Sequence, residues 1–236
     1  MNDYAWPSAS PEDGPALAPV SSTTLREQVT QAVRSALMMG HFKPGQTVTV
    51  KSLCSLLHAS VMPTREAVNR LIAEGALELR ANRTVAVPAV SLQEFNELTQ
   101  LRCLIEGLAG AQAVQAFRPA HTQALLALER QMADAVACQD IDAYLDANAR
   151  FHFTIYALGS TAYTRSIIEK LWVRVGPLIR YCLTESGLEA SSNLHQTMID
   201  GLARRDPQAL RQAIESDILG AAQTIRRSHD LWPSGA

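Results

Sequence analysis

The chain has 236 residues, of which 47% are hydrophobic and 19% charged, a composition that suits two modest globular domains. No apolar run is long enough to cross a bilayer, and no segment has the pattern of a signal peptide, so we expect a cytoplasmic protein with no membrane partner. The four cysteines lie far apart in helical patterns, which argues against a zinc knuckle or a disulfide scaffold and favours buried thiols.

The net charge of −2 conceals an asymmetry along the chain. Residues 1–20 contain four prolines and three acids but no Lys or Arg, which predicts a disordered tail. Residues 21–90 hold eight Lys and Arg against four acids, whereas residues 91–236 hold 13 against 16. A basic segment beside an acidic one is typical of a DNA-binding domain joined to a regulatory domain, although a solvated surface can show the same balance.

The first 70 residues after the tail predict helices followed by a hairpin. Apolar residues recur at helical spacing as far as Gly40, and Pro63 falls in the first turn of a later helix, where proline is tolerated. The expected elements are helices over residues 25–37 and 51–58, a third helix capped by Ser60, and strands over 76–79 and 84–87. This order is that of a winged helix-turn-helix.

From residue 91 onward the sequence shows only helical patterns. Ser91 and Glu94 form a capping box, and Asp206 followed by Pro207 is a strong helix start. We expect helices over residues 91–117, 119–138, 140–158, 161–186 (kinked at Gly176-Pro177), 190–204 and 207–228. The predicted fold is therefore mainly α, with an N-terminal winged helix over 21–90 and an antiparallel all-α bundle over 91–230.

In a winged helix the third helix enters the major groove, and the hairpin contacts phosphate or the minor groove. Arg65 lies one turn into that helix, where its guanidinium could bind a guanine. For each arginine taken alone, a solvated surface charge is the alternative. The expected DNA-binding residues are Lys51, Ser60, Val61, Met62, Arg65, Asn69, Arg83 and Thr84.

Four polar residues interrupt the apolar stripes of three helices in the second domain. Asn148 and His152 share one helix face, and His195 and Asp217 lie among apolar residues of two later helices. Because a buried polar group without a partner costs on the order of a few kcal/mol, such groups meet each other, a metal or a ligand. We expect one shared internal site, and separate hydrogen-bonded core residues are the alternative.

Two arginines of the second domain are candidates for binding an acid. Arg102 falls on the inward side of its helix, and a buried guanidinium needs an anion. Either Glu106, one turn later, or a ligand carboxylate could supply it. Arg174 is a weaker candidate, with a surface salt bridge as its alternative.

The first domain resembles the DNA-binding domain of GntR-type regulators over residues 25–87. The matching residues are Leu25-Arg26-Glu27-Gln28, Pro44-Gly45, Leu53, Ala59-Ser60, Pro63, Arg65-Glu66-Ala67, Arg70-Leu71, Glu74-Gly75 and Asn82-Arg83. The chain departs from that pattern at Val61, where the family usually has a basic residue, and at Thr84, where it usually has glycine. Val61 or Met62 could instead contact a thymine methyl group.

Residues 91–229 resemble the FCD-type ligand-binding domain of the FadR-like branch of these regulators. The matching motifs are Leu101-Arg102 with Glu106, Asn148 with Phe151-His152, His195, and Arg205-Asp206 with Ala209 before Asp217. In that family many members bind a divalent metal through an aspartate, a histidine four residues later and two histidines 22 apart, with small organic acids on or beside the metal. Here Asn148 replaces the aspartate, and Asp217 replaces the last histidine.

The resemblance implies a divalent metal (Zn, Ni or Mn) on Asn148, His152, His195 and Asp217, and an effector contacted by Arg102, His152, His195 and Arg174. A metal-free pocket, in which the two histidines and Asp217 bond the effector directly, is the alternative.

Together these features predict a ligand-responsive bacterial transcription regulator, not an enzyme. We expect a small organic acid to control its affinity for operator DNA. One winged helix reads only a few base pairs, so we expect a homodimer on a near-palindromic operator, with the interface in the helical domain. The rival is a metal-dependent enzyme domain fused to a DNA-binding module.

Overall fold

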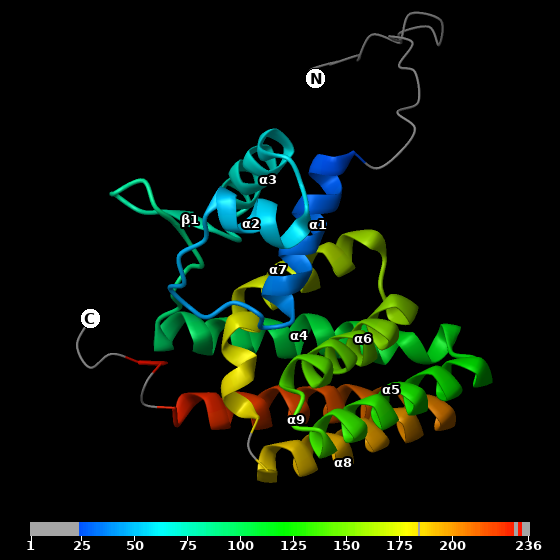
Figure 1. Ribbon diagram of the computed structural model, residues 1–236. Helices are drawn as coiled ribbons and strands as arrows, with labels where there is room; N and C mark the ends of the chain where they lie inside the picture. The colour runs from blue at the N-terminus through cyan, green and yellow to red at the C-terminus, as the bar shows by residue number, and fades with distance from the viewer. Residues whose placement is uncertain (1–23, 184, 229–230, 233–236) are drawn as a thin grey trace, which may run out of the picture.

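The computed structural model describes residues 24–183, 185–228 and 231–232, so the predicted tail over 1–20 lies outside it. The described part is mainly α, as predicted, and forms two lobes (Figure 1). The elements are α1 (Leu25–Met38), α2 (Val50–Leu57), α3 (Val61–Ala73), β1 (Glu78–Leu79), β2 (Val85–Ala86), α4 (Leu92–Ala116), α5 (Pro119–Ala137), α6 (Ile141–Gly159), α7 (Ala162–Ile179), a 3₁₀ turn (Arg180–Cys182), α8 (Glu185–Arg204) and α9 (Pro207–Arg226). None of the described helices is long and apolar enough to cross a membrane.

The first lobe is a winged helix built on a small apolar core. The Thr24 hydroxyl and the Glu27 carboxylate form a capping box that begins α1. The buried side chains of this lobe include Val33, Leu37, Leu53, Ala67 and Leu71. The hairpin pairs Glu78 with Ala86 and Leu79 with Val85, and the Val48 N–H donates to Val85 O. The wing is therefore attached to the segment that precedes α2.

The second lobe is a helical bundle. Helix α4 packs against α6, α7 and α9, while α5 packs on α6 and α8 packs on α9. The capping box of Ser91 with Glu94 and the N-cap at Asp206, with Pro207 as the first helical residue, both form as predicted. These contacts bring α6, α8 and α9, which carry the four predicted polar residues, into one bundle.

Two local expectations were wrong, and a third was met only in part. Helix α7 continues through Pro177 but ends at Ile179, not at 186, where the chain tightens into a 3₁₀ turn before α8 begins at Glu185. Ser60 occupies the N-cap of α3, but its hydroxyl makes no cap hydrogen bond. The cysteines are free as expected, yet Cys138 is exposed and the other three are only half-buried.

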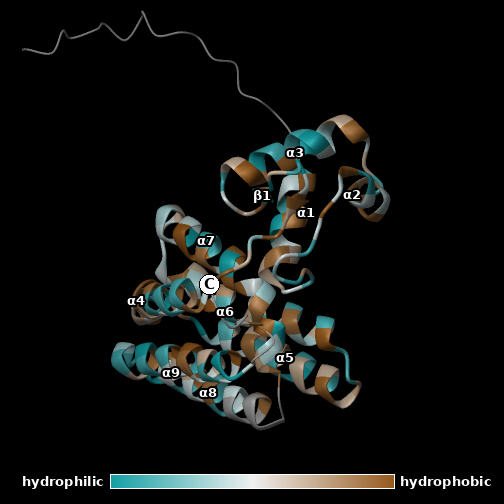
Figure 2. Ribbon diagram, turned by 90° about the vertical axis from the view of Figure 1, so that its left-hand side faces the viewer, coloured by the Kyte–Doolittle hydropathy of each residue, from teal (hydrophilic) through white to brown (hydrophobic). Residues whose placement is uncertain are grey.

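The two lobes meet where α1 ends on α7 (Figure 2). A Cβ atom at Gly176 of α7 would lie 2.1 Å from Leu37 O and 2.7 Å from Met38 O, so only glycine permits this close approach. Beside it, Arg180 donates to Gly40 O at 3.3 Å and pairs with Asp142 at 2.6 Å. Backbone contact and the hydrogen bond from Arg180 to Gly40 O thus join the winged helix to the end of α7.

We predict that Gly176→Ala lowers the free energy of unfolding by about 1–3 kcal/mol, because the added methyl group forces α1 and α7 apart. The matched control is Gly220→Ala in α9, where an added Cβ meets nothing within 4 Å and should stabilise the helix by about 0.5–1 kcal/mol. Urea denaturation measures both. A Gly176→Ala protein as stable as the Gly220→Ala protein would contradict this account of the lobe contact.

Candidate functional site

The outer face of α3 carries half of the eight residues predicted to bind DNA. The side chains of Val61 and Met62 at its start are 55% and 68% exposed, and Arg65 and Asn69 follow on the exposed surface. Arg65 forms no ion pair within the described part of the chain. Apolar and cationic groups at the N-terminal half of α3 are therefore free to meet base edges.

The remaining predicted DNA contacts flank α3. Lys51 is exposed in the first turn of α2, and Arg83 is exposed in the wing loop. Arg83 adopts a left-handed backbone (φ 61°), and the Asn82 side chain accepts a hydrogen bond from the Thr84 N–H. Thr84 is half-buried in this turn, so its role is to support the conformation of the wing more than to offer a side chain to DNA. Ser60 is exposed beside Val61.

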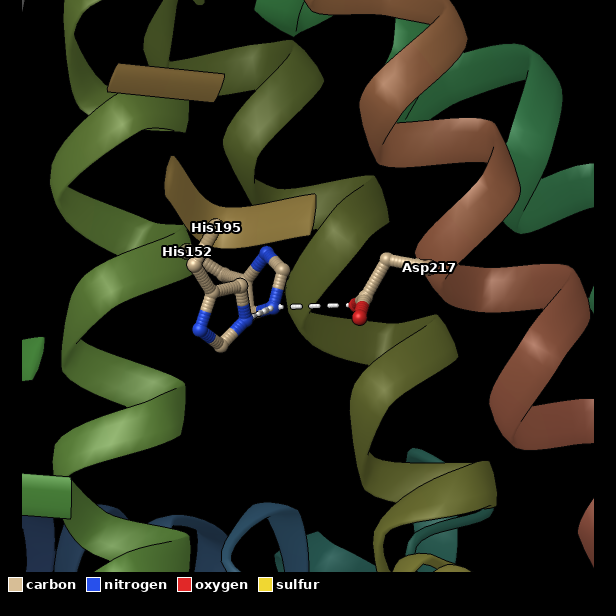
Figure 3. A group of neighbouring side chains, drawn as sticks. All are labelled: His152, His195 and Asp217. Atoms are coloured by element: carbon tan, nitrogen blue, oxygen red, sulfur yellow. Dashed lines mark hydrogen bonds and ion pairs between the residues drawn. The ribbon is translucent and has the colours of Figure 1, made fainter. Parts of the chain in front are cut away.

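In the second lobe, His152 of α6, His195 of α8 and Asp217 of α9 converge (Figure 3). One ligand atom from each lies within 4.8 Å of the other two. The Nε2 atoms of the two histidines are 3.3 Å apart, and His152 Nε2 is 3.3 Å from an Asp217 carboxylate oxygen. Both histidines are buried, with exposures of 2% and 1%.

Hydrogen bonds to the Nδ1 atoms of the two histidines fix which ring nitrogen faces the other two residues of the site. His195 Nδ1 lies 2.5 Å from Glu129, and because a carboxylate only accepts, this nitrogen carries a hydrogen. Tyr156 donates its hydroxyl hydrogen to Glu106, so its oxygen accepts from His152 Nδ1 at 3.3 Å. The Nε2 atoms of the two rings then face each other and Asp217, and His195 Nε2 also lies 3.3 Å from the Ser191 hydroxyl oxygen. This donor set fits a bound cation, held as metal-binding histidines commonly are.

The charges around the site favour the same conclusion. Burial by itself raises the pKa of Asp217, but the hydrogen bond with His152 and the charges of both histidines lower it to about 2, so the carboxylate is ionised at neutral pH. The connected side chains comprise the carboxylates of Glu106, Glu129 and Asp217 and one guanidinium, that of Arg102. With neutral imidazoles this network carries −2, which one divalent cation balances, whereas two protonated imidazoles balance it without a metal.

Arg102 and Glu106 form a buried ion pair in α4. Arg102 donates to the two Glu106 oxygens at 2.6 and 3.2 Å, and Trp172 and Tyr156 donate to the same carboxylate. Burial lowers the pKa of Arg102, but the Glu106 carboxylate outweighs this effect and the net shift is upward. Glu106, rather than a ligand, therefore supplies the main anion that Arg102 needs.

A cavity of about 250 Å³ opens beside the three converging residues. Its wall includes Arg102, Asn148, His152 and Asp217. His195 does not line the cavity, but it belongs to the three-residue centre with His152 and Asp217. Asn148 is half-buried, and it forms no hydrogen bond to the other three within the described residues. Arg174 is not among the residues that line the cavity, and its charge helps to lower the pKa of Glu94, so its contact with an effector stays a prediction.

Two family matches cover both lobes. Residues 25–87 match the family described as bacterial regulatory proteins, gntR family, and residues 97–219 match the FCD domain. The chain belongs to the GntR family. Its FCD domain is the effector-binding domain of such transcriptional regulators, so this chain is a GntR-family transcriptional regulator.

Curated and solved GntR relatives agree with this assignment. The chain is 26% identical to the HTH-type transcriptional regulator McbR of Escherichia coli (strain K12) over 85% of its own length and 92% of McbR. It is 22% identical to the transcriptional repressor GlaR of the same organism, over 83% and 93% of the two chains. The solved structure of E. coli McbR/YncC superposes with a TM-score of 0.82 at 25% identity, over 88% of this chain and all of the other.

Sequence analysis missed three residues that hold the GntR-family site together. Glu129 orients His195, Tyr156 joins His152 to Glu106, and Ser191 donates to Asp217 at 2.9 Å. Spacing could have suggested Tyr156 and Ser191, since each lies four residues from its histidine on the same helix. Glu129 lies on a different helix from its partner, so no local pattern indicates it.

We predict that Glu106→Ala lowers the free energy of unfolding by about 3–5 kcal/mol, because it leaves the Arg102 charge buried without a partner. The control is Glu97→Ala, an exposed acid of the same helix, which should change stability by about 0.5 kcal/mol or less. Chemical denaturation of both variants measures the difference. Equal losses in the two variants would show that the buried network does not depend on Glu106.

Proposed function

We propose that this regulator senses a small organic acid in its helical domain (residues 91–230) and releases or binds operator DNA through its winged helix (residues 21–90). The observation that carries the proposal is the convergence of His152, His195 and Asp217 beside a cavity. A buried set of acceptors that faces an open volume suits ligand recognition better than structural support. Apolar side chains of the wall, such as Phe95, Val175 and Ile218, suit the carbon skeleton of an acid, and Thr99 and Gln223 add polar groups.

We infer that a divalent metal (Zn, Ni or Mn) is the cofactor at this centre. His152, His195 and Asp217 would hold it, and their donor set and charge support that assignment. When bound, the metal supplies a Lewis acid that attracts carboxylate oxygens. The protein's own part is to orient the imidazoles through Glu129 and Tyr156 and to exclude water with the cavity wall.

The proposed route from the cavity to the DNA runs through α7. Trp172, Val175 and Ile179 of α7 line the cavity, while Gly176 of the same helix touches α1. Helix α1 in turn packs against α3, which carries Arg65. A ligand that moves α7 would therefore move the DNA-reading helix through backbone contacts.

We also propose that the regulator is a homodimer on a near-palindromic operator. One winged helix contacts too few base pairs for specificity, so a symmetric pair is needed. Leu101, Leu104 and Leu108 form an exposed apolar stripe on α4, with exposures of 40%, 56% and 44%. Such a stripe is available as a contact between the helical domains of two copies.

A sensing role is proposed in preference to catalysis. The donor set could hold a catalytic metal, which is why a metal-dependent enzyme was the rival. The similar proteins are transcriptional regulators, and the cavity lies on the helix that contacts the DNA-binding lobe. Transmission of a signal to the DNA-binding lobe requires this contact between helices, whereas catalysis does not.

We predict that Arg65→Ala weakens binding to a specific operator by about 1–3 kcal/mol and relaxes discrimination at one base position in each half-site. Lys51→Ala is the matched comparison, because the loss of a phosphate contact should weaken binding to all DNA sequences about equally and reduce the salt dependence of the DNA affinity. Band-shift titrations on promoter fragments at two salt concentrations measure both effects. Unchanged operator affinity in Arg65→Ala would refute the assignment of α3 as the recognition helix.

We predict that His195→Ala weakens binding of Zn²⁺ by more than about 100-fold, since it removes a ligand and not merely an outer hydrogen bond. DNA binding in the absence of metal should persist, because the winged helix has its own core. In the unaltered protein, metal affinity should fall at acidic pH, because a protonated imidazole cannot bind a metal, while Asp217, with its pKa of about 2, stays ionised.

Chelator competition measures the metal affinity, with His58→Ala, an exposed histidine of the winged helix, as the control. The proposed metal site would be excluded by equal metal affinity in the His195→Ala and His58→Ala proteins.

A further inference from the structure

Two exposed apolar side chains lie together at the start of α3. Val61 and Met62 are the first two residues of this helix, and they are 55% and 68% exposed. The other side of the helix is buried and includes Ala67, Val68 and Leu71. The core of the winged helix is therefore closed by that side, and its packing does not account for the apolar pair at the start of α3.

The surroundings of this pair are polar and cationic. Arg65 and Asn69 follow Val61 at intervals of four residues, so the three side chains form one exposed row along α3. Lys51 of α2 and Arg83 of the wing are exposed on the same lobe. An apolar protein groove that covered the pair would have to take Arg65 out of water, whereas DNA, a polyanion, attracts all three cations. The charges therefore favour DNA as the partner of this surface.

We propose that Val61, with Met62 beside it, recognises the C5-methyl group of a thymine in each half-site of the operator. The inference rests on the proposed function, because it requires α3 to be the recognition helix. The N-terminal residues of such a helix meet base edges in the major groove. The thymine methyl is the apolar group that base pairs present there, so apolar side chains at this point select for it.

The chemistry of Val61 makes the contact selective. A valine in a helix has one strongly preferred χ1 rotamer, so its two methyl groups hold a fixed position, whereas Met62 is flexible and adapts to what lies beside it. Val61 has no side-chain hydrogen-bonding group. A G·C pair at this position would lose water from its polar edge without gaining a partner, and a T·A pair gains an apolar contact instead.

The spacing along α3 places this thymine near the base that Arg65 contacts. Four residues of an α-helix rise about 6 Å, and successive base pairs rise about 3.4 Å. A helix that lies along the groove therefore sets the two contacts about two base pairs apart, and the length of the arginine side chain changes this by about one. We expect the thymine within about three base pairs of the guanine that Arg65 binds.

Removal of single methyl groups from the DNA tests the proposal. Selection from random DNA with the full-length protein supplies the operator, and each thymine in one half-site is then replaced by deoxyuridine, which lacks only the C5-methyl group. We expect a thymine position near the guanine at which this replacement weakens binding about fourfold, the value for one buried methyl-sized group. At the same position, 5-methylcytosine should bind more tightly than cytosine by a similar factor.

A double variant separates the contact from any effect of the methyl group on the shape of the DNA. The Val61→Ala, Met62→Ala protein should bind the thymine and deoxyuridine operators with affinities within about 1.5-fold of each other, and it should keep the guanine preference that belongs to Arg65. Leu56→Ala is the matched control, because Leu56 is 71% exposed on α2, a helix that crosses the DNA backbone without entering the groove. This control should keep the fourfold effect.

The remaining outcomes separate the inference from the function on which it rests. The proposal would be overturned if no thymine within about three base pairs of the guanine responded to loss of its methyl group, or if the response persisted in the double variant. A response lost in Leu56→Ala would assign the contact to α2 and would also overturn it. A protein that selects no sequence, or a guanine preference that survives Arg65→Ala, would instead refute α3 as the recognition helix.

Discussion

Inside the helical domain, the carboxylates of Glu106, Glu129 and Asp217 share one hydrogen-bonded network with a single guanidinium, that of Arg102. Buried charges are stable only when they are compensated, so this network needs two further positive charges, from protonated imidazoles or from a bound cation. The two imidazoles between the carboxylates present their Nε2 atoms to one another. In the proposed function a divalent cation at that point supplies both charges, and the partners of the two Nδ1 atoms orient the imidazoles toward it.

The helices that carry this network also join the two lobes. Trp172 of α7 donates to Glu106, and Gly176, four residues later, lies against the end of α1. The ligand cavity and the winged helix therefore share one rigid element. In the proposed route a small displacement at the cavity reaches α3 through packed helices, because the close backbone contact at Gly176 couples α7 to α1.

Much of the fold follows from local sequence signals. The capping box of Ser91 with Glu94 and the Asp206-Pro207 start set two helix beginnings that the structure reproduces. The end of α7 was missed because the helical pattern continues past Ile179, where the chain instead tightens into a 3₁₀ turn. Hydrophobic periodicity indicates where a helix can extend, and backbone hydrogen bonds decide where it stops.

The site was only partly predictable for a related reason. Inward-facing polar residues indicated His152, His195 and Asp217, because an unpaired polar group cannot remain in a core. Periodicity could not show that Asn148 stands apart from the other three, nor that Arg174 lies outside the cavity wall. Glu129 was missed altogether, since its contact with His195 joins residues 66 positions apart. Such contacts depend on tertiary packing, which no short window of sequence contains.

The central claim is that the buried network is completed by a divalent cation between the two histidines and Asp217. The most direct measurement is anomalous X-ray diffraction from crystals of the full-length protein grown with Mn²⁺ or Zn²⁺, recorded on both sides of the absorption edge of the metal. The account predicts one strong anomalous peak within coordination distance of His152 Nε2, His195 Nε2 and Asp217 Oδ2. Crystals with no peak at that point, and with the two Nε2 atoms still in direct contact, would contradict it.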